Sequence, residues 1–140
     1  MTLEAYVRMR VAGLLDRLEA EVQRAAAERH AEAIHDLRVS IRRLTQALRA
    51  FRTLLGKKPS KQVRIALRQV MDIAAEIRSR DIALELFAAA RVPDGAPACG
   101  RLRQERQAAE RRLLTKIRAW HRGKVCERWR KLLGPAERAA

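Results

Sequence analysis

The sequence is poor in aromatic residues, cysteine, glycine and proline, and each shortage narrows what the chain can be. Phe, Trp and Tyr together make up 4% of its 140 residues, which argues against holding single-stranded nucleic acid by base stacking. Two cysteines, Cys99 and Cys126, are too few and too far apart for a disulfide framework. The six glycines and four prolines are clustered, so we expect few breaks in secondary structure.

No segment has the apolar length of a membrane helix or the pattern of a signal peptide. Residues 1–10 lack an apolar core, and no run of 18 apolar residues follows. We therefore expect a soluble, cytoplasmic protein. His30, His35 and His121 have no cysteine or acid beside them that completes a metal-ligand set, so we expect neither a metal site nor a cofactor.

Arginine is what the chain has in excess. Lys and Arg total 31 against 16 Asp and Glu, a net charge of +15, and 25 of the 31 are arginine. A surplus this large destabilises the compact state by self-repulsion, so it indicates a polyanionic partner, although a GC-rich genome can also produce it. Arginine grips phosphate with two parallel hydrogen bonds. Residues 1–30 are neutral, whereas residues 31–90 carry +6 and residues 91–140 carry +9, which suggests a basic face.

Apolar residues recur at alternating spacings of three and four, a pattern that predicts amphipathic helices. We expect long helices over about residues 2–32, 34–55, 61–90 and 100–122, and a short one over 125–133 that Gly134-Pro135 ends. Residues 57–60 are expected to form a turn, with Ser60 as a candidate N-cap. Four long helices joined by short turns predict an all-α fold, an antiparallel four-helix bundle, in one domain spanning residues 1–140.

Residues 34–55 carry two interleaved stripes. The apolar stripe consists of Ile34, Leu37, Ile41, Leu44, Leu48, Phe51 and Leu55. The second stripe lies one residue further along the sequence, which is about 100° around the helix. It consists of His35, Arg38, Arg42, Thr45, Arg49 and Arg52. An ordinary solvated helix face mixes charges of both signs. This row contains no acid, so it indicates a surface that binds an anion.

A second basic row is expected on the helix over residues 61–90, at Lys61, Arg64, Arg68 and Arg78. If the two helices are neighbours, their rows flank one groove that could follow an extended polyanion. Further candidates on the next helix are Arg111, Arg118 and Arg122. Asp81 falls within a buried stripe and needs a partner, for which Arg78 or Arg80 is the natural candidate.

The stretch from Ala33 to Phe51 resembles the CHAD family, the conserved histidine α-helical domains. It contains the pattern H-x-x-R-x-x-x-R-R, at His35, Arg38, Arg42 and Arg43. The segment Glu76–Asp81 resembles that family's Arg-Asp segment at the same distance along the chain. The resemblance implies an all-helical domain that binds inorganic polyphosphate through a basic groove or pore, and association with polyphosphate granules in the cytoplasm.

Together, the resemblance and the two rows predict the polyphosphate-binding residues His35, Arg38, Arg42, Arg43, Arg49, Arg52, Lys61, Arg64, Arg68 and Arg78. The chain departs from the family at two points. Thr45 stands where family members often have another arginine. A typical member also has two four-helix halves related by a pseudo-twofold axis, and this chain covers only one half. We therefore expect a homodimer that completes the site.

Other functions stay open from the sequence. A nucleic-acid-binding basic helical domain is the alternative that charge alone would allow, although no turn predicts a helix-turn-helix motif.

An enzyme is not expected. The tunnel enzymes that accompany the family need an E-x-E-x-K strand, and the nearest segment here, residues 19–23, has Gln23 in place of lysine within a predicted helix. His35 can be structural or can donate to phosphate, and a purely structural bundle remains a further alternative.

Overall fold

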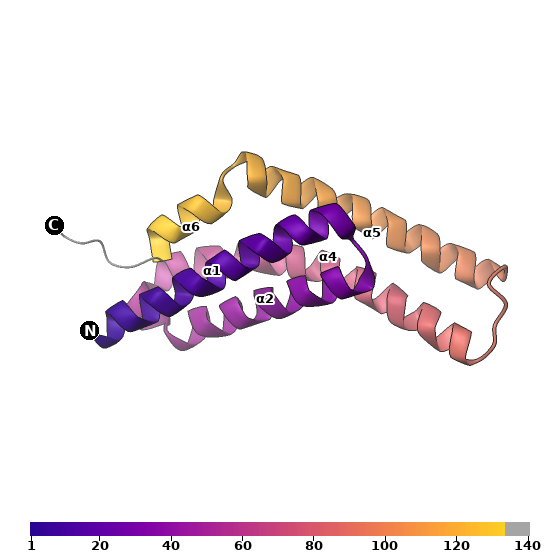
Figure 1. The fold of residues 1–140 in the computed structure, drawn as a ribbon, viewed down its shortest axis with the longest axis horizontal. Helices are drawn as coiled ribbons and strands as arrows, with labels where there is room; N and C mark the ends of the chain where they lie inside the picture. The colour runs from indigo at the N-terminus through magenta and orange to yellow at the C-terminus, as the bar shows by residue number, and fades with distance from the viewer. Residues whose placement is uncertain (134–140) are drawn as a thin grey trace.

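The computed structural model describes residues 1–133, and over those residues it contains only helices and the short turns that join them (Figure 1). The all-α class predicted from the sequence is therefore confirmed. The helices are α1 (Leu3–Glu28), α2 (Ala31–Ala50), α3 (Arg52–Leu55), α4 (Lys57–Ala89), α5 (Pro97–Arg122) and α6 (Val125–Leu133). The predicted stop at Gly134-Pro135 lies outside the described residues.

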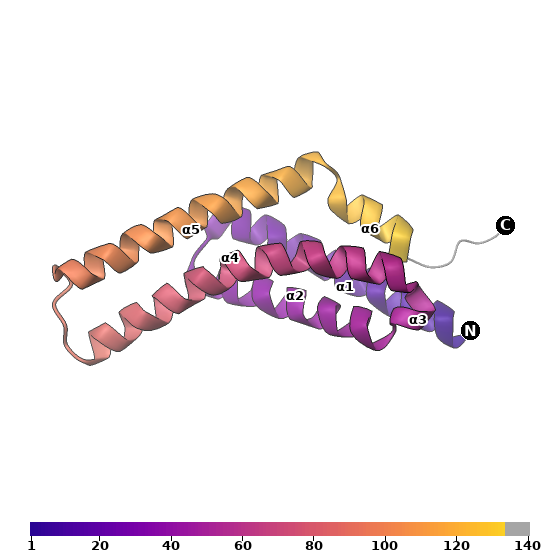
Figure 2. The same ribbon diagram turned by 180° about the vertical axis from the view of Figure 1, so that it is seen from behind.

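The arrangement is more elaborate than the predicted four-helix bundle. Helices α1, α2 and the first half of α4 lie side by side, and α6 folds back against α1 (Figures 1 and 2). Helices α4 and α5 form a long antiparallel hairpin whose far half projects beyond the turn that joins α1 to α2. The helices therefore share one core at one end of the molecule, and a two-helix arm extends from the other.

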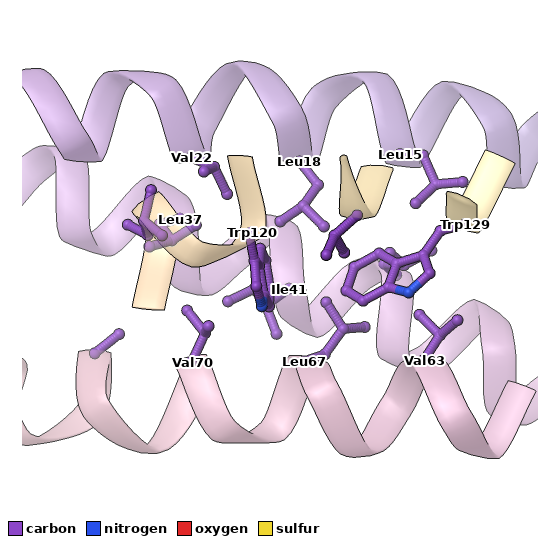
Figure 3. Close-up of a cluster of buried hydrophobic side chains, with 14 of the residues drawn as sticks. Leu15, Leu18, Val22, Leu37, Ile41, Val63, Leu67, Val70, Trp120 and Trp129 are labelled. Atoms are coloured by element: carbon purple, nitrogen blue, oxygen red, sulfur yellow. The ribbon is translucent and has the colours of Figure 1, made fainter. Parts of the chain in front are cut away.

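The core gathers the apolar stripes of every helix. In Figure 3, α1 and α4 face each other across it, with Leu15 and Leu18 on one side and Val63 and Leu67 on the other. Trp120 from α5 and Trp129 from α6 lie between these layers. Their rings meet edge to face, with centroids 5.1 Å apart and planes at 74°, a geometry that the quadrupoles of aromatic rings favour. The two tryptophans therefore pack in the core.

Six of the seven positions in the apolar stripe predicted over residues 34–55 are buried, and Phe51 is the exception. On α1 the buried side chains include Leu15 and Leu18, whereas Leu3 at the start of the helix is 65% exposed. Phe51 was expected in the buried stripe of a continuous helix over residues 34–55. It is instead 38% exposed, because the helix stops at Ala50 and restarts as α3 at Arg52.

The turn expected over residues 57–60 is the first turn of α4. Proline is tolerated in a first helical turn because the amide that it lacks would have no partner inside the helix, so Pro59 does not delay the start. Gly56 precedes the helix with φ +98°, a conformation that glycine adopts without steric cost. Ser60 is not the N-cap. Its buried hydroxyl donates to the Leu48 carbonyl of α2 at 2.9 Å and so ties α4 to α2.

Two side-chain caps fix the starts of α1 and α2. The Thr2 side chain accepts a hydrogen bond from the amide of Ala5 and so caps α1. Helix α1 ends at Glu28, and its C-cap Arg29 has a left-handed backbone, with φ +47°. His30 caps α2, because its Nδ1 accepts from the amide of Ala33 at 3.1 Å. This role of His30 was not predicted, because histidine is not a common N-cap residue.

A polar junction joins the arm to the core where α1 turns into α2. The Arg106 guanidinium of α5 donates to Asp81 of α4 at 2.5 Å, to Glu110, and to the main-chain carbonyl of Arg29 at 3.3 Å. The predicted partner of Asp81 was therefore wrong. Arg78 lies 3.7 Å from Glu85, and Arg80 donates to Glu105 at 3.2 Å. The carboxylate points toward α5, which the helical spacing along α4 alone could not reveal.

Within residues 1–133, no helix combines the length and the hydropathy needed to cross a membrane.

We expect replacement of Arg106 by methionine to destabilise the fold by about 2–3 kcal/mol, because Asp81 would stay partly buried without its charged partner. The two side chains are only 16% and 12% exposed. Urea denaturation followed by circular dichroism measures the change. The matched control is Arg103→Met, which removes an exposed pair with Asp94 and should change stability by less than about 0.5 kcal/mol. Equal losses in the two variants would contradict the structural role of the junction.

Candidate functional site

Helix α2 presents its arginine row beside the stripe that it buries. Ile34, Leu37 and Ile41 are essentially inaccessible to solvent. One position further along, Arg42, Arg49 and Arg52 are exposed and Arg38 is half-buried. Because the neighbouring stripe packs into the core, the row lies at the edge of α2 and not on the side opposite the core.

A groove of about 380 Å³ lies between α2 and α4. Its walls come from residues 41–49 of one helix and residues 64–72 of the other. The lining residues are Ile41, Arg42, Thr45, Gln46, Arg49, Arg64, Arg68, Met71 and Asp72. Four of the nine are arginines, two from each wall, and a single one is an acid. The groove therefore brings together arginines from both rows that the sequence singled out.

Thr45 does not leave the groove without basic residues. Helices α2 and α4 run antiparallel (Figure 1), and Arg64 and Arg68 of α4 line the same groove as Thr45. The α4 wall therefore supplies arginines to the groove in which α2 lacks one at position 45.

Ser60 both anchors α4 to α2 and contacts an arginine of the groove. Its hydroxyl donates to the Leu48 carbonyl and accepts a hydrogen bond from Arg64 Nε at 3.3 Å. Since Ser60 is fully buried, this contact fixes the inner end of the Arg64 guanidinium. Its outer nitrogens stay available to a ligand in the groove.

Arg38 occupies an electrostatically unusual position beyond the Arg42 end of the groove. Its Nε is buried and has no hydrogen-bond partner among the described residues. Burial lowers the pKa of the Arg38 guanidinium, and the positive charges of Arg42 and Arg78 lower it further. Three arginines from two helices thus lie close enough to repel one another, and Arg78 is the predicted site residue that α4 adds here.

The remaining predicted site residues do not line the groove. His35, Arg43, Arg52 and Lys61 are all exposed. Asp36, the acid nearest to Arg43 along the chain, is bound by Arg24, and over residues 1–133 no ion pair of Arg43 is present.

The arginines of α5 belong to other surfaces. Arg111 borders a shallow hollow between α4 and α5, together with Arg112 and Lys116. Arg118 and Arg122 border a separate hollow between α1 and α5. None of these residues lines the groove between α2 and α4.

Two polar residues of the groove, one of them acidic, were not predicted from the sequence. Gln46 follows Arg42 by four residues, and Asp72 follows Arg68 by the same interval. Residues four apart share a helix face, so this spacing could have placed both in the groove. Asp72 is the more consequential omission because it puts one negative charge at the rim.

The described residues offer no set of ligands for a metal ion. No group of three or more His, Cys, Asp and Glu side chains comes together within residues 1–133. Burial, with the Glu19 carboxylate nearby, raises the pKa of the Cys126 thiol to about 11. The thiol is therefore protonated at neutral pH and is a poor nucleophile.

Comparison with known families agrees with this geometry. The model of the CHAD domain matches residues 10–140, which is nearly the whole chain, and the chain belongs to the CHAD domain family. Members of that family are associated with polyphosphate binding. Comparison with curated proteins and with solved structures gave no significant match.

Proposed function

We propose that this protein binds inorganic polyphosphate in the groove between α2 and α4. The observation that carries the proposal is the groove itself, in which Arg42, Arg49, Arg64 and Arg68 meet a single acid. Membership of the CHAD domain family supports it. Guanidinium groups bind phosphate oxygens through charge-assisted, paired hydrogen bonds, which are stronger than hydrogen bonds between neutral groups.

The spacing of the basic residues suits a repeating anion. Polyphosphate has no bases to read, so its recognition is electrostatic and geometric, like the contacts that proteins make to a nucleic acid backbone. Arg38 and Arg49 are eleven residues apart on α2, or about 16 Å at the rise of an α-helix. Exposed Lys61 and Arg52 extend the path at one end, and exposed His35 lies near the other.

The proposed activity is binding without catalysis. The groove holds one carboxylate, Asp72, whereas the metal-dependent chemistry of phosphoryl groups uses several acids to hold its cations. We therefore expect no release of phosphate from polyphosphate when Mg²⁺ or Mn²⁺ is supplied.

The second part of the proposal is a homodimer formed through the projecting arm. Residues 82–105 carry three basic and three acidic residues, so the arm is neutral in a chain of net charge +15. It also exposes apolar side chains, with Ile82 at 40% and Leu86 at 63%. Two copies repel each other least where they are neutral, and burial of these side chains favours association. A second copy therefore fits this surface, with the same patch contributed by both copies.

Replacing Arg42 or Arg68 by glutamine should weaken the binding of polyphosphate about tenfold each, the usual effect of losing a hydrogen bond to a charged group. Each variant should also lower the slope of log affinity against log salt by about one. Isothermal titration with polyphosphate of defined length, at two salt concentrations, measures both quantities.

The control for this experiment is Arg10→Gln, which removes one exposed charge from α1. It should change affinity little, because Arg10 lies on another helix. A loss in Arg10→Gln equal to that in Arg42→Gln would show attraction by net charge alone. Displacement of polyphosphate by duplex DNA at equal phosphate concentration would favour the nucleic-acid alternative.

Light scattering at micromolar concentration should show a dimer, and Leu86→Asp should shift it to a monomer because a charge would enter the apolar contact. The matched control is Ile65→Asp on the same helix. Ile65 is 53% exposed but lies on the part of α4 within the bundle, so the dimer should persist. A wild-type monomer, both with and without polyphosphate, would refute dimerisation.

A further inference from the structure

Arg38 differs from the other arginines that line or flank the groove because part of its guanidinium is already dehydrated. Its Nε is buried without a hydrogen-bond partner among the described residues. A buried donor that is left unpaired costs free energy. A bound anion that accepts a hydrogen bond from this nitrogen would recover that free energy. Arg49 and Arg52 are exposed, so an anion bound to them gains no such contribution.

The surroundings of Arg38 concentrate positive charge. Arg42 lies one turn along α2, and Arg78 approaches from α4, so the two helices contribute three guanidinium groups to one place. The carboxylate nearest to this cluster in the described residues is Glu85, 3.7 Å from Arg78 and 65% exposed. The cluster can therefore neutralise more negative charge than a single arginine of the groove.

The basic path stops at this cluster. Beyond Arg78 on α4 come Arg80, which is bound to Glu105, Asp81, which is bound to Arg106, and Glu85. On α2 the preceding charged residue is Asp36, bound to Arg24. A polyanion that followed the groove past Arg38 would approach these acids and then the neutral arm. Its chain is therefore favoured to end at the cluster.

The end of a polyphosphate chain is chemically distinct from its middle. An internal phosphate carries one negative charge, whereas a terminal phosphate resembles a phosphate monoester and carries about −1.5 to −2 at pH 7, with three terminal oxygens. We propose that Arg38, Arg42 and Arg78 form a subsite for the terminal phosphate of a chain whose internal phosphates lie in the groove. This inference rests on the proposed function, and it also predicts which end of the groove holds the end of the polyphosphate.

The test compares two forms of polyphosphate of the same defined length, one with free ends and one with each end capped by a single neutral alkyl ester group. Capping leaves each terminal phosphate with one negative charge and turns one of its terminal oxygens into an ester oxygen. Wild-type protein should bind the free-ended form about tenfold more tightly, since a charge-assisted hydrogen bond is lost on capping. Isothermal titration gives the ratio of the two affinities.

Two variants locate the effect. In Arg38→Gln and in Arg78→Gln the ratio should fall toward one, because the subsite that distinguishes the two forms is impaired. In Arg49→Gln, the matched control within the groove, both affinities should fall and the ratio should be retained. Circular dichroism of each variant verifies folding, and the two separate substitutions guard against one that unfolds.

The outcomes separate this inference from the proposed function. Equal binding of free and capped chains by wild-type protein would overturn the terminal subsite while leaving the groove as the binding site. The terminal subsite would also be overturned if the ratio of the two affinities were the same in Arg38→Gln and Arg78→Gln as in the wild-type protein. Failure of both forms to bind would overturn the proposed function itself.

Discussion

Helix α2 buries one stripe of side chains and exposes the next, and the offset between them decides where the arginines lie. Residues one apart are separated by about 100° around a helix. Packing Leu37, Ile41 and Leu44 into the core therefore fixes Arg38 and Arg42 at the edge of α2. The neighbour at this edge is α4, whose own buried stripe sets Arg64 and Arg68 at the facing edge. The groove is thus a consequence of core packing and needs no separate scaffold.

Acids are distributed so that the groove keeps its charge. Arg24 pairs with Asp36 and Glu28, and hydrogen bonds to these two carboxylates raise its pKa. Arg130 of α6 pairs in the same way with Glu19 and Asp16 of α1. Among those described arginines whose pKa departs from its ordinary value, only Arg38 is shifted downward. The direction of the shift separates Arg24 and Arg130, which are paired with acids, from Arg38, whose charged neighbours are arginines.

The sequence predicted best what depends on one helix alone. Alternating spacings found the helices, their buried stripes and the two arginine rows, because each is a property of one helix's periodicity. Contacts between helices were harder. Asp81 had basic neighbours on its own helix, yet its partner Arg106 comes from α5. The break at Phe51 and the start of α4 before Pro59 were also missed. Proline is compatible with the first turn of a helix, so Pro59 does not mark the residue at which α4 begins.

Like charges confined to one groove repel each other, and the arrangement across it limits that cost. Arg42 and Arg49 are seven residues apart on one wall, or about 10 Å, and Thr45 lies between them. Arg64 and Arg68 of the opposite wall line the same groove as Thr45. An arginine at position 45 would add a fifth guanidinium group to this lining and would raise the repulsion in the absence of a ligand. The uncharged residue that interrupts the row on α2 therefore lowers the electrostatic cost of holding four arginines in one groove.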